Sequence, residues 1–262
     1  MARRSLKDCR IVLTGASSGI GRALARELAP QGVHLLLVAR RQAELDSLAA
    51  ELQQRGVGSA QPLAGDITDP DLRKTLLQRV QNDWQGLDLL VNNAGVSAHS
   101  RFADSNEQTL RRIMEVNFFA PAELTRGAIP LLRNGRDPLV VNVGSILGHR
   151  GVPYNSEYCA SKFALRGWSE ALRAELHREG IGVLLVSPGT TDTDFFEHLL
   201  AQEEATPWGK PQGVSPEQVA REMVRAVERR RREIFPNWRG RLLVTLNRFC
   251  PGFVDRVLNR YG

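Results

Sequence analysis

The feature that most limits how this chain can fold is a glycine-rich turn between an apolar segment and a helical pattern. The segment Ile11–Thr14 predicts a buried strand, and the apolar spacing from Arg22 to Ala29 predicts a helix. The residues between them read Gly15-Ala16-Ser17-Ser18-Gly19-Ile20-Gly21. A strand, a glycine turn and a helix in this order form a context in which a dinucleotide can bind, because the N–H groups at a helix start carry partial positive charge.

Each of the three glycines in the turn has a separate expected task. Gly15 makes the tight turn, Gly19 lets a pyrophosphate approach the backbone, and Gly21 lets the helix and the strand pack closely. By itself such a turn is weak evidence, since a strand-to-helix turn that binds nothing has the same appearance. The interpretation therefore depends on motifs elsewhere in the chain.

Apolar segments of strand length alternate with helical patterns through most of the chain. The predicted strands are Ile11–Thr14, Val33–Ala39, Gly58–Leu63, Leu87–Asn92, Leu139–Val143 and Gly182–Ser187. The predicted helices between them include Ala43–Gln54, Asp69–Trp84, Asn106–Leu132 and Glu157–Arg178. This alternation predicts an α/β fold, a doubly wound Rossmann-type parallel sheet with helices on both faces, formed by residues 1–262 as a single domain. Ligands of such sheets bind beyond the carboxyl ends of the strands.

Composition excludes several other classes of protein. With 262 residues, 42% of them hydrophobic and 24% charged, the chain is long enough for a sizeable core and has globular values. No apolar run reaches the roughly 18 residues of a membrane span. The three cysteines are scattered without metal-ligand spacing, which predicts no metal site and a reducing compartment, expected to be the cytoplasm. The net charge of +6 suits anionic ligands such as cofactor phosphates, and no nucleic-acid-binding motif accompanies it.

Tyr158 and Lys162 are four residues apart in a predicted helix, so their side chains share one face. A tyrosine is a poor proton donor near neutral pH because its ordinary pKa is about 10. The positive charge of Lys162 favours the phenolate and is expected to lower that pKa, which allows proton exchange near neutral pH. Ser145 lies thirteen residues before Tyr158 and follows another predicted strand.

Taken together, these motifs resemble the short-chain dehydrogenase/reductase family. The resemblance rests on the glycine spacing after Thr14, on Asn92-Asn93-Ala94-Gly95 after an apolar strand, on Ser145, and on the Tyr158/Lys162 pair, in the family's order. It extends from about Cys9 to Thr193. It implies an oxidoreductase that interconverts a carbonyl and an alcohol by hydride transfer with a nicotinamide cofactor.

The resemblance implies four catalytic residues. Tyr158 would donate a proton to the substrate oxygen, and Ser145 would hydrogen-bond that oxygen and stabilise its developing charge. Lys162 would lower the pKa of Tyr158 and hold the ribose hydroxyls of the cofactor. Asn117 would support a water chain that passes protons to Lys162; the alternative is a polar residue that caps or kinks a long helix.

The end of the second predicted strand bears on the choice between NAD(H) and NADP(H). Ala39 stands where an NAD enzyme usually has an acidic residue, and two arginines follow it. Arg40 resembles the NADP-selective arginine of the family, because a guanidinium binds a 2′-phosphate that a carboxylate would repel. Arg41 would help to bind the 2′-phosphate or would only stand at the start of the next helix. Ser17 and Ser18 would donate further hydrogen bonds to the same phosphate. NADP(H) is therefore the expected cofactor.

The family pattern also implies contacts with the rest of the cofactor. Asp66 and Ile67 resemble its adenine-binding pair, although Asp66 has a nearly equal interpretation as a turn former before Asp69-Pro70. Thr191 and Thr193 are both candidates for contact with the carboxamide or pyrophosphate, and the sequence does not choose between them. The remaining expected cofactor-binding residues are Ile20, Asn92, Ala94, Gly95, Pro188 and Gly189.

Two segments near the C-terminus have several candidate roles. Residues 190–214 are predicted to form a substrate lid. Its apolar inner face would consist of Phe195, Phe196, Leu199 and Trp208. The alternative is that these four residues only pack the loop against the body of the protein. Residues 239–262 read as two short amphipathic helices divided by Pro251-Gly252. This tail is expected to form a subunit interface or to line the substrate mouth, and contact with a membrane surface ranks below these roles.

The expected partners are a hydrophobic ketone, aldehyde or alcohol and further copies of the chain. The resemblance implies a homodimer or homotetramer formed through the helices that contain Asn117 and Tyr158. The alternative function is that of a sensor or scaffold that binds NADP(H) in the same fold but does not turn over a substrate. The full set of Asn117, Ser145, Tyr158 and Lys162 favours the enzyme, because binding alone needs none of them.

Overall fold

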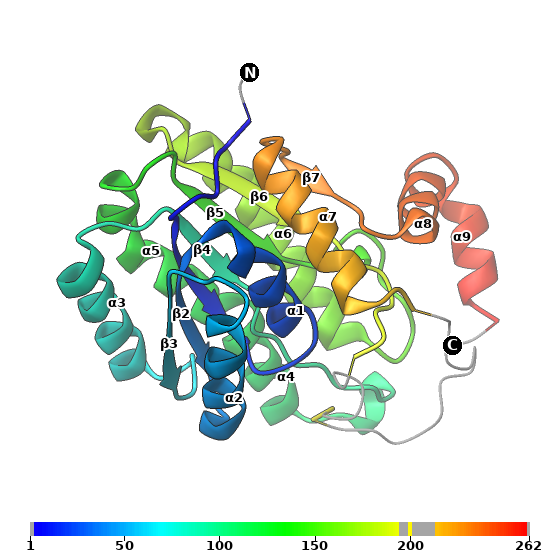
Figure 1. Cartoon of the computed structure of the whole chain (residues 1–262). Helices are drawn as coiled ribbons and strands as arrows, with labels where there is room; N and C mark the ends of the chain where they lie inside the picture. Colours follow the sequence, from blue (N-terminus) through cyan, green and yellow to red (C-terminus); the bar gives the residue numbers. More distant parts are fainter. Residues whose placement is uncertain (1–2, 194–198, 201–212, 261–262) are drawn as a thin grey trace.

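The computed structural model describes residues 3–193, 199–200 and 213–260 (Figure 1). Within them, one parallel sheet has seven strands in the order β3-β2-β1-β4-β5-β6-β7. The strands are β1 (Arg10–Thr14), β2 (His34–Ala39), β3 (Ser59–Ala64), β4 (Leu89–Asn92), β5 (Leu139–Val143), β6 (Gly182–Val186) and β7 (Glu233–Ile234). The predicted doubly wound α/β fold is confirmed.

Helices cover both faces of the sheet. One face carries α1 (Gly19–Leu28), α2 (Gln42–Gln53) and α7 (Pro216–Glu228), and the other carries α3 (Pro70–Trp84), α5 (Ala120–Arg133) and α6 (Ser156–Glu175). Adjacent residues of a strand point to opposite faces. In β2, Leu35 and Leu37 therefore pack with the α1 group, whereas Leu36 and Val38 pack with the α3 group. Burial on both faces explains why the inner strands read as mostly apolar runs, unlike the half-buried edge strands β3 and β7.

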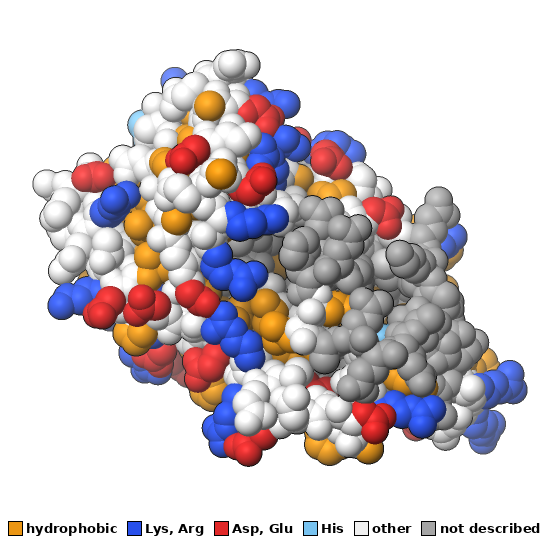
Figure 2. All heavy atoms as spheres, turned by 90° about the horizontal axis from the view of Figure 1, so that it is seen from below, with side chains coloured by type: hydrophobic (Ala, Val, Ile, Leu, Met, Phe, Trp, Pro, Cys, Tyr) orange, Lys and Arg blue, Asp and Glu red, His pale blue; other side chains and the backbone are white. Residues whose placement is uncertain are grey.

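The strand order reverses at β1, which pairs with β2 on one side and with β4 on the other. Such a reversal opens a crevice at the carboxyl ends of the strands, where ligands of doubly wound sheets bind. Figure 2 looks onto this end of the molecule, and basic side chains border an area of hydrophobic side chains there. A ligand site is therefore expected at the carboxyl ends of β1, β4 and β5.

The predicted long helix over Asn106–Leu132 is divided in the structure by a wider turn. It consists of α4 (Glu107–Met114), a π-helical turn (Glu115–Phe119) and α5. Pro121 has no N–H group to donate to the carbonyl of Asn117, so the regular helical pattern is interrupted there. The N–H group of Ala120 donates instead to the carbonyl of Glu115, five residues back. This wider turn carries Asn117.

Two short helices, α8 (Trp238–Phe249) and α9 (Pro251–Leu258), follow β7, which confirms the two helices predicted for the tail. Figure 1 shows them at the edge of the molecule, beyond α7. Pro251 occupies the first turn of α9, where its missing N–H group is tolerated. Among the residues that the structure describes, no helix combines the length and the apolarity needed to cross a membrane.

The segment predicted as a lid, residues 190–214, is described at its two ends and at residues 199–200. Phe195, Phe196 and Trp208 lie outside the described residues. Thr191 forms an isolated parallel bridge with Val214, so the two ends of the segment meet. The lid itself stays a prediction.

Candidate active site

The glycine turn after β1 has a conformation that suits glycine alone. Gly15 has a φ of +66°, and a Cβ atom there would lie 2.8 Å from the Cα of Ala94. A Cβ atom at Gly21 would lie 2.2 Å from the carbonyl oxygen of Gly15. Gly15 therefore makes a tight turn, and Gly21 lets α1 pack directly against it.

Asn93 holds this turn against β4, a role that the sequence motif did not reveal. Its Nδ2 donates to the carbonyl oxygen of Thr14 at 3.0 Å and to that of Gly15 at 3.1 Å. The hydroxyl of Thr14 accepts from the N–H groups of Asn93 and Ala94, at 3.0 Å and 3.1 Å, and donates to the carbonyl of Val91. The turn is therefore preformed by bonds between the ends of two neighbouring strands.

The first turn of α1 fits a pyrophosphate. Its leading N–H groups have no acceptors within the helix, the Ser18 side chain makes no capping bond to them, and the turn contains no acidic residue. Thr193 lies against this turn, since its Cγ2 is 3.1 Å from the position that a Cβ atom of Gly19 would take. Thr191 is instead buried and donates to the carbonyl of Gly189 at 3.2 Å. Thr193 is thus the threonine that the structure places at the glycine turn.

Arg40 and Arg41 follow β2 at the same edge of the sheet. Arg40 is exposed. Arg41 precedes the first residue of α2, and its Nη2 donates to the hydroxyl of Ser17 at 3.1 Å. The guanidinium of Arg41 beside a serine of the glycine turn, with the exposed Arg40 directly before it in the chain, offers donors that fit a phosphate.

Asp66 follows β3 and is held by two other residues. Its carboxylate accepts from the N–H and the hydroxyl of Thr68, at 3.0 Å and 2.8 Å, and forms an ion pair with Arg112 of α4. Burial acts to raise the pKa of Asp66, but the bonds from Thr68 and Arg112 outweigh it and hold this pKa below its ordinary value. The bonds to Thr68 match the turn-forming interpretation, and the Arg112 contact is one that the sequence did not indicate. The neighbouring Ile67 is buried.

Asn92 and Gly95 face different surroundings at the end of β4. The Asn92 side chain points into the core, where its Nδ2 donates to Asn142 Oδ1 at 2.8 Å and to Thr125 Oγ1 at 3.1 Å. Its backbone is therefore what it can offer a cofactor. Gly95 lies beside two of the candidate catalytic residues, because a Cβ atom there would be 3.3 Å from Asn117 Oδ1 and 3.8 Å from Lys162 Nζ.

Pro188 and Gly189 follow β6 and border the same end of the sheet. The carbonyl of Pro188 accepts from the N–H of Ile146 at 2.9 Å, which ties the segment to the turn after Ser145. Gly189 lies against the start of α8, since a Cβ atom there would be 3.3 Å from Asn237 Nδ2. These contacts link the proposed cofactor side of the site to the C-terminal helices.

Tyr158, Lys162 and Ser145 come together between α6 and the end of β5. Lys162 Nζ lies 5.5 Å from the centroid of the Tyr158 ring, and the side chains of Ser145 and Tyr158 are hydrogen-bonded. Lys162 is buried, and its Nζ donates to the carbonyl of Val143 at 3.0 Å. A phenol, a hydroxyl and an ammonium group therefore share one small volume.

The expected lowering of the Tyr158 pKa is wrong for the protein in this state. Burial raises the pKa of the phenol above its ordinary value, and the hydrogen bond with Ser145 opposes only part of this effect. Burial also lowers the pKa of Lys162 to about 8. The prediction considered the charge of Lys162 but not the desolvation of both groups, which disfavours the phenolate and the ammonium alike.

Asn117 joins three separate elements from inside the π-helical turn. Its Oδ1 accepts from the N–H of Val96 at 2.9 Å, and its Nδ2 donates to the Val96 carbonyl at 2.9 Å and to Ser161 Oγ at 3.0 Å. Ser161 Oγ donates in turn to the carbonyl of Tyr158 at 2.8 Å. Asn117 thus positions the backbone of Tyr158 through Ser161, and its role in a water chain to Lys162 stays a prediction.

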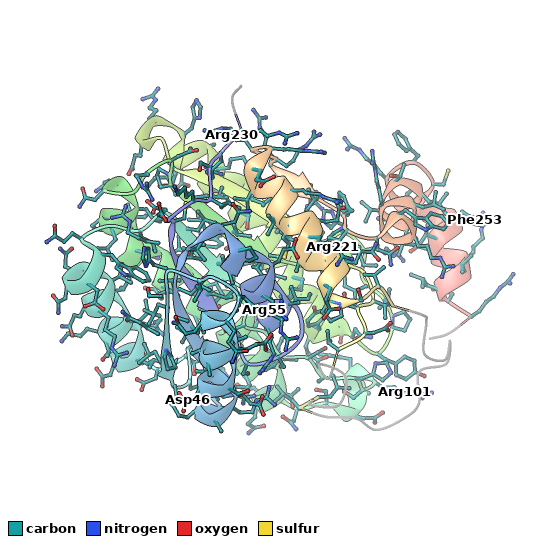
Figure 3. The ribbon with its side chains drawn as sticks, in the orientation of Figure 1. Asp46, Arg55, Arg101, Arg221, Arg230 and Phe253 are labelled. Carbon is teal, nitrogen blue, oxygen red and sulfur yellow. The ribbon has the colours of Figure 1, made fainter. Side chains whose placement is uncertain are left out.

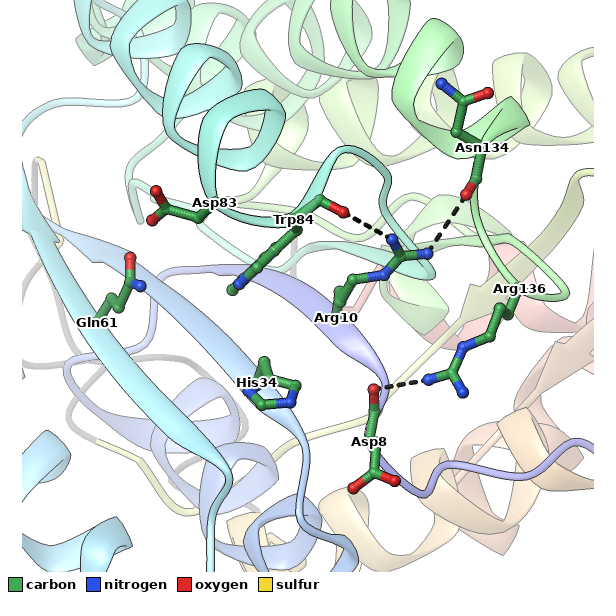
Figure 4. A pocket seen from close by; sticks show the side chains of 8 residues that line it. All are labelled: Asp8, Arg10, His34, Gln61, Asp83, Trp84, Asn134 and Arg136. Carbon is green, nitrogen blue, oxygen red and sulfur yellow. Dashed lines mark hydrogen bonds between the residues drawn. The ribbon is translucent and has the colours of Figure 1, made fainter.

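A hollow of about 720 Å³ lies at the opposite end of the sheet and carries no part of this chemistry (Figure 4). Arg10 and His34, the first residues of β1 and β2, line it. The guanidinium of Arg10 donates to Asp88 and to the carbonyls of Trp84 and Asn134, so its donors already have acceptors. We therefore assign no ligand to this hollow.

Comparison with known proteins identifies the family. The model of the short chain dehydrogenase family matches residues 10–204. A Bacillus subtilis protein named uncharacterized oxidoreductase YxnA is 31% identical over 261 residues, covering 98% of this chain and 73% of its own. The crystal structure of a short-chain dehydrogenase from Streptomyces avermitilis is 30% identical, with a TM-score of 0.82 over 96% of this chain and 94% of that one. A short-chain dehydrogenase from Sphingobium yanoikuyae in complex with NADPH is 27% identical, with a TM-score of 0.79 over 96% and 95%. The chain belongs to the short-chain dehydrogenase/reductase family, a family of oxidoreductases that bind nicotinamide cofactors.

Proposed function

We propose that the protein is an NADP(H)-dependent oxidoreductase that interconverts a carbonyl and an alcohol on a hydrophobic substrate. The observation that carries the proposal is the convergence of Ser145, Tyr158 and Lys162 beside Gly95, at the edge of the preformed glycine turn. A proton donor and an ammonium group would thereby lie next to a bound dinucleotide. A nicotinamide bound there would supply or accept the hydride.

The side chains of the chain itself would manage the proton and the charge. In the reductive direction the Tyr158 hydroxyl donates its proton to the substrate oxygen, while the Ser145 hydroxyl donates a hydrogen bond to the same oxygen. The phenolate left on Tyr158 is unfavourable in a buried site, and the positive charge of Lys162 offsets part of that cost. Asn117 and Ser161 keep the Tyr158 backbone in place during the transfer.

The preference for NADP(H) over NAD(H) rests on the end of β2. Arg40 and Arg41 offer two positive charges there, and Ala39 leaves the position without a carboxylate that would repel a 2′-phosphate. The similar protein from Sphingobium yanoikuyae has NADPH bound, which supports the same choice.

The hydrophobic character of the substrate is part of the proposal, and the core beside Asn117 is apolar. Val96, Ala98, Ile113 and Val116 form a small buried cluster next to the segment that Asn117 holds. Further copies of the chain are a second expected partner. Phe119, in the π-helical turn, and Phe163, in α6, are 46% and 43% exposed, and the proposed homodimer or homotetramer would cover them.

The proposal is tested by NADPH oxidation with a panel of aromatic, steroid-like and long-chain carbonyl compounds, followed by absorbance. Tyr158→Phe should lower turnover by a factor of about 100 or more, because it removes the proton donor. It should leave NADPH binding, measured by fluorescence titration, nearly unchanged. Tyr154→Phe is the matched control, since it removes another tyrosine hydroxyl from the segment before α6.

The outcomes separate the proposed enzyme from its alternative. Turnover in Tyr158→Phe equal to that of the unaltered protein would defeat the mechanism. NADPH binding without turnover of any compound in the unaltered protein would favour the sensor or scaffold.

Cofactor choice is tested separately with Arg40→Ala and Arg41→Ala. Each should raise the KM for NADPH by about ten-fold, the typical worth of one charge-assisted hydrogen bond, with little change for NADH. Arg55→Ala, an exposed arginine just beyond α2, is the control. Equal losses with both cofactors would remove the NADP(H) assignment.

A further inference from the structure

The C-terminal helices expose large hydrophobic side chains to an unusual extent. Of the nine exposed large hydrophobic residues among the described parts of the chain, five lie on α8 and α9. They are Trp238 (70% exposed), Leu242 (58%), Phe249 (76%), Phe253 (55%) and Val257 (37%). An ordinary surface helix turns polar side chains outward, so this surface needs a separate explanation.

Within each helix these side chains lie on one face rather than being scattered around it. Each residue of an α-helix is rotated by about 100° from the last, which places Trp238, Leu242 and Phe249 within about 40° of one another. Phe253 and Val257 are four residues apart on α9 and share a face in the same way. Figure 3 places Phe253 at the outer edge of the molecule, away from the sheet.

The opposite side of α8 is already used to attach the helices to the body. Gly240 lies on Ile146, since a Cβ atom at Gly240 would be 2.7 Å from Ile146 Cγ2. Asn247 Nδ2 donates to the carbonyl of His149 at 3.3 Å, and Arg150 donates to Asn247 Oδ1 at 3.1 Å. The apolar face therefore points away from the body because the helix is held by its other side.

Positive charge surrounds this face. Arg239, Arg241, Arg248, Arg256 and Arg260 are exposed. None of these five forms an ion pair with a residue that the structure describes. Arg239 instead lies over the ring of Trp238, 5.6 Å from its centroid. The one carboxylate of α9, that of Asp255, is paired with Arg150.

We propose that this C-terminal surface, formed by the five hydrophobic residues and the five arginines of α8 and α9, docks onto an anionic lipid surface. Aromatic and aliphatic side chains enter the boundary of the bilayer while arginines bind lipid phosphates, as in helices that lie in a membrane interface. A second copy of the chain is a poorer occupant. Two-fold pairing through this face would bring the arginines of both copies into one interface, where the one carboxylate of α9 is already paired with Arg150, so the positive charges would repel.

The test is sedimentation of the full chain with vesicles of phosphatidylcholine alone and of phosphatidylcholine with about one third phosphatidylserine. The unaltered protein should sediment with the anionic vesicles and not with the neutral ones, and added salt should release it. Absence of binding to anionic vesicles, or equal binding to both kinds, would overturn the proposal.

Variants assign the binding to this surface. Phe249→Ser with Phe253→Ser, and separately Arg248→Gln with Arg256→Gln, should each weaken binding by about ten-fold or more, since each arginine near an anionic surface contributes about five-fold. The controls are Phe102→Ser, which removes an equally exposed phenylalanine elsewhere, and Lys74→Gln with Arg79→Gln, two exposed cations on α3. Loss of binding in the controls equal to that in the variants would contradict the proposal.

Cys250, between the two helices, allows a direct readout of where the contact forms. It is exposed whereas Cys9 and Cys159 are buried, so a polarity-sensitive thiol dye should label Cys250 selectively. Its emission should shift to the blue with anionic vesicles. An unchanged emission would rule out the lipid surface. Sedimentation velocity that shows two copies of the chain held together through Phe249 and Phe253 without vesicles would rule it out as well.

Discussion

The candidate catalytic residues and the C-terminal helices are held by the rest of the molecule in opposite ways. Asn117 and Lys162 are 1% and 4% exposed, and their polar atoms bond to the backbone or side chains of other elements. In α8 and α9, by contrast, only Gly240 and Val254 are buried. The first region holds its polar side chains in fixed positions, whereas the second region presents a broad surface. Buried polar contacts are therefore concentrated around Asn117 and Lys162, where the positions of side chains matter. They are few on α8 and α9, where the area of the exposed surface matters.

The largest effect on stability should come from Asn117→Ala, which removes the hydrogen bonds that join three elements of the first region. The variant leaves the N–H and the carbonyl of Val96 buried without their partner and removes a bond to Ser161. We expect a loss of about 4 kcal/mol in the free energy of unfolding, because each unpaired buried group costs about 1–3 kcal/mol. Urea unfolding measures this loss, and Asn134→Ala, at an exposed position, is the control. A loss in the free energy of unfolding below about 1 kcal/mol would show that the backbone groups of Val96 find other partners.

Lys162→Met should reveal the cost of the buried ammonium through pH. Burial lowers the pKa of Lys162 from 10.5 to about 8, so between these values the unfolded chain binds more protons than the folded one. The free energy of unfolding of the unaltered protein, relative to Lys162→Met, should therefore rise by about 3 kcal/mol from pH 8 to pH 10.5. Urea unfolding of both proteins across this range tests it. A difference that does not vary with pH would show that the folded protein holds the ammonium without penalty.

Arg112→Met should have a smaller effect, because its ion pair with Asp66 is only partly buried. We expect a loss of about 1 kcal/mol in stability at pH 7 and a few-fold weaker binding of the dinucleotide, since Asp66 would lose the partner that orients it. Arg111→Met is the matched control, with a more exposed pair to Glu107 on the same helix. Equal cofactor affinity in both variants would separate Arg112 from the site.

The smallest effect on stability should come from the second region. Phe249→Ser is expected to change the free energy of unfolding by less than about 0.5 kcal/mol, because this side chain is 76% exposed. Thermal unfolding provides the measurement. A loss of 2 kcal/mol or more, roughly the value for a buried aromatic, would show that the surface is covered in solution and would erase the contrast between the two regions.

The sequence predicted the features of the fold that depend on neighbouring residues. The predicted strand Leu139–Val143 coincides with β5, because a strand buried on both faces appears as an uninterrupted apolar run. The helix predicted over Asn106–Leu132 missed the π-helical turn, although Pro121 in the same segment was a visible signal of an interruption.

The contacts that the sequence did not predict join residues far apart in the chain. Arg112 meets Asp66 across 46 positions, and Asn117 meets Ser161 across 44. No local pattern encodes such a meeting. The raised pKa of Tyr158 has the same origin, since desolvation depends on every element packed around the phenol and not on the spacing to Lys162.

Gly240 has a consequence for how this protein can change over evolution. Because α8 rests on Ile146 at the one place where it lacks a side chain, a larger residue at 240 demands a smaller one at 146. Position 146 is the residue directly after Ser145, so the size of the residue at position 240, on a peripheral helix, is tied to a position next to the candidate active site. We expect the sizes of the residues at these two positions to vary inversely among relatives that keep both helices.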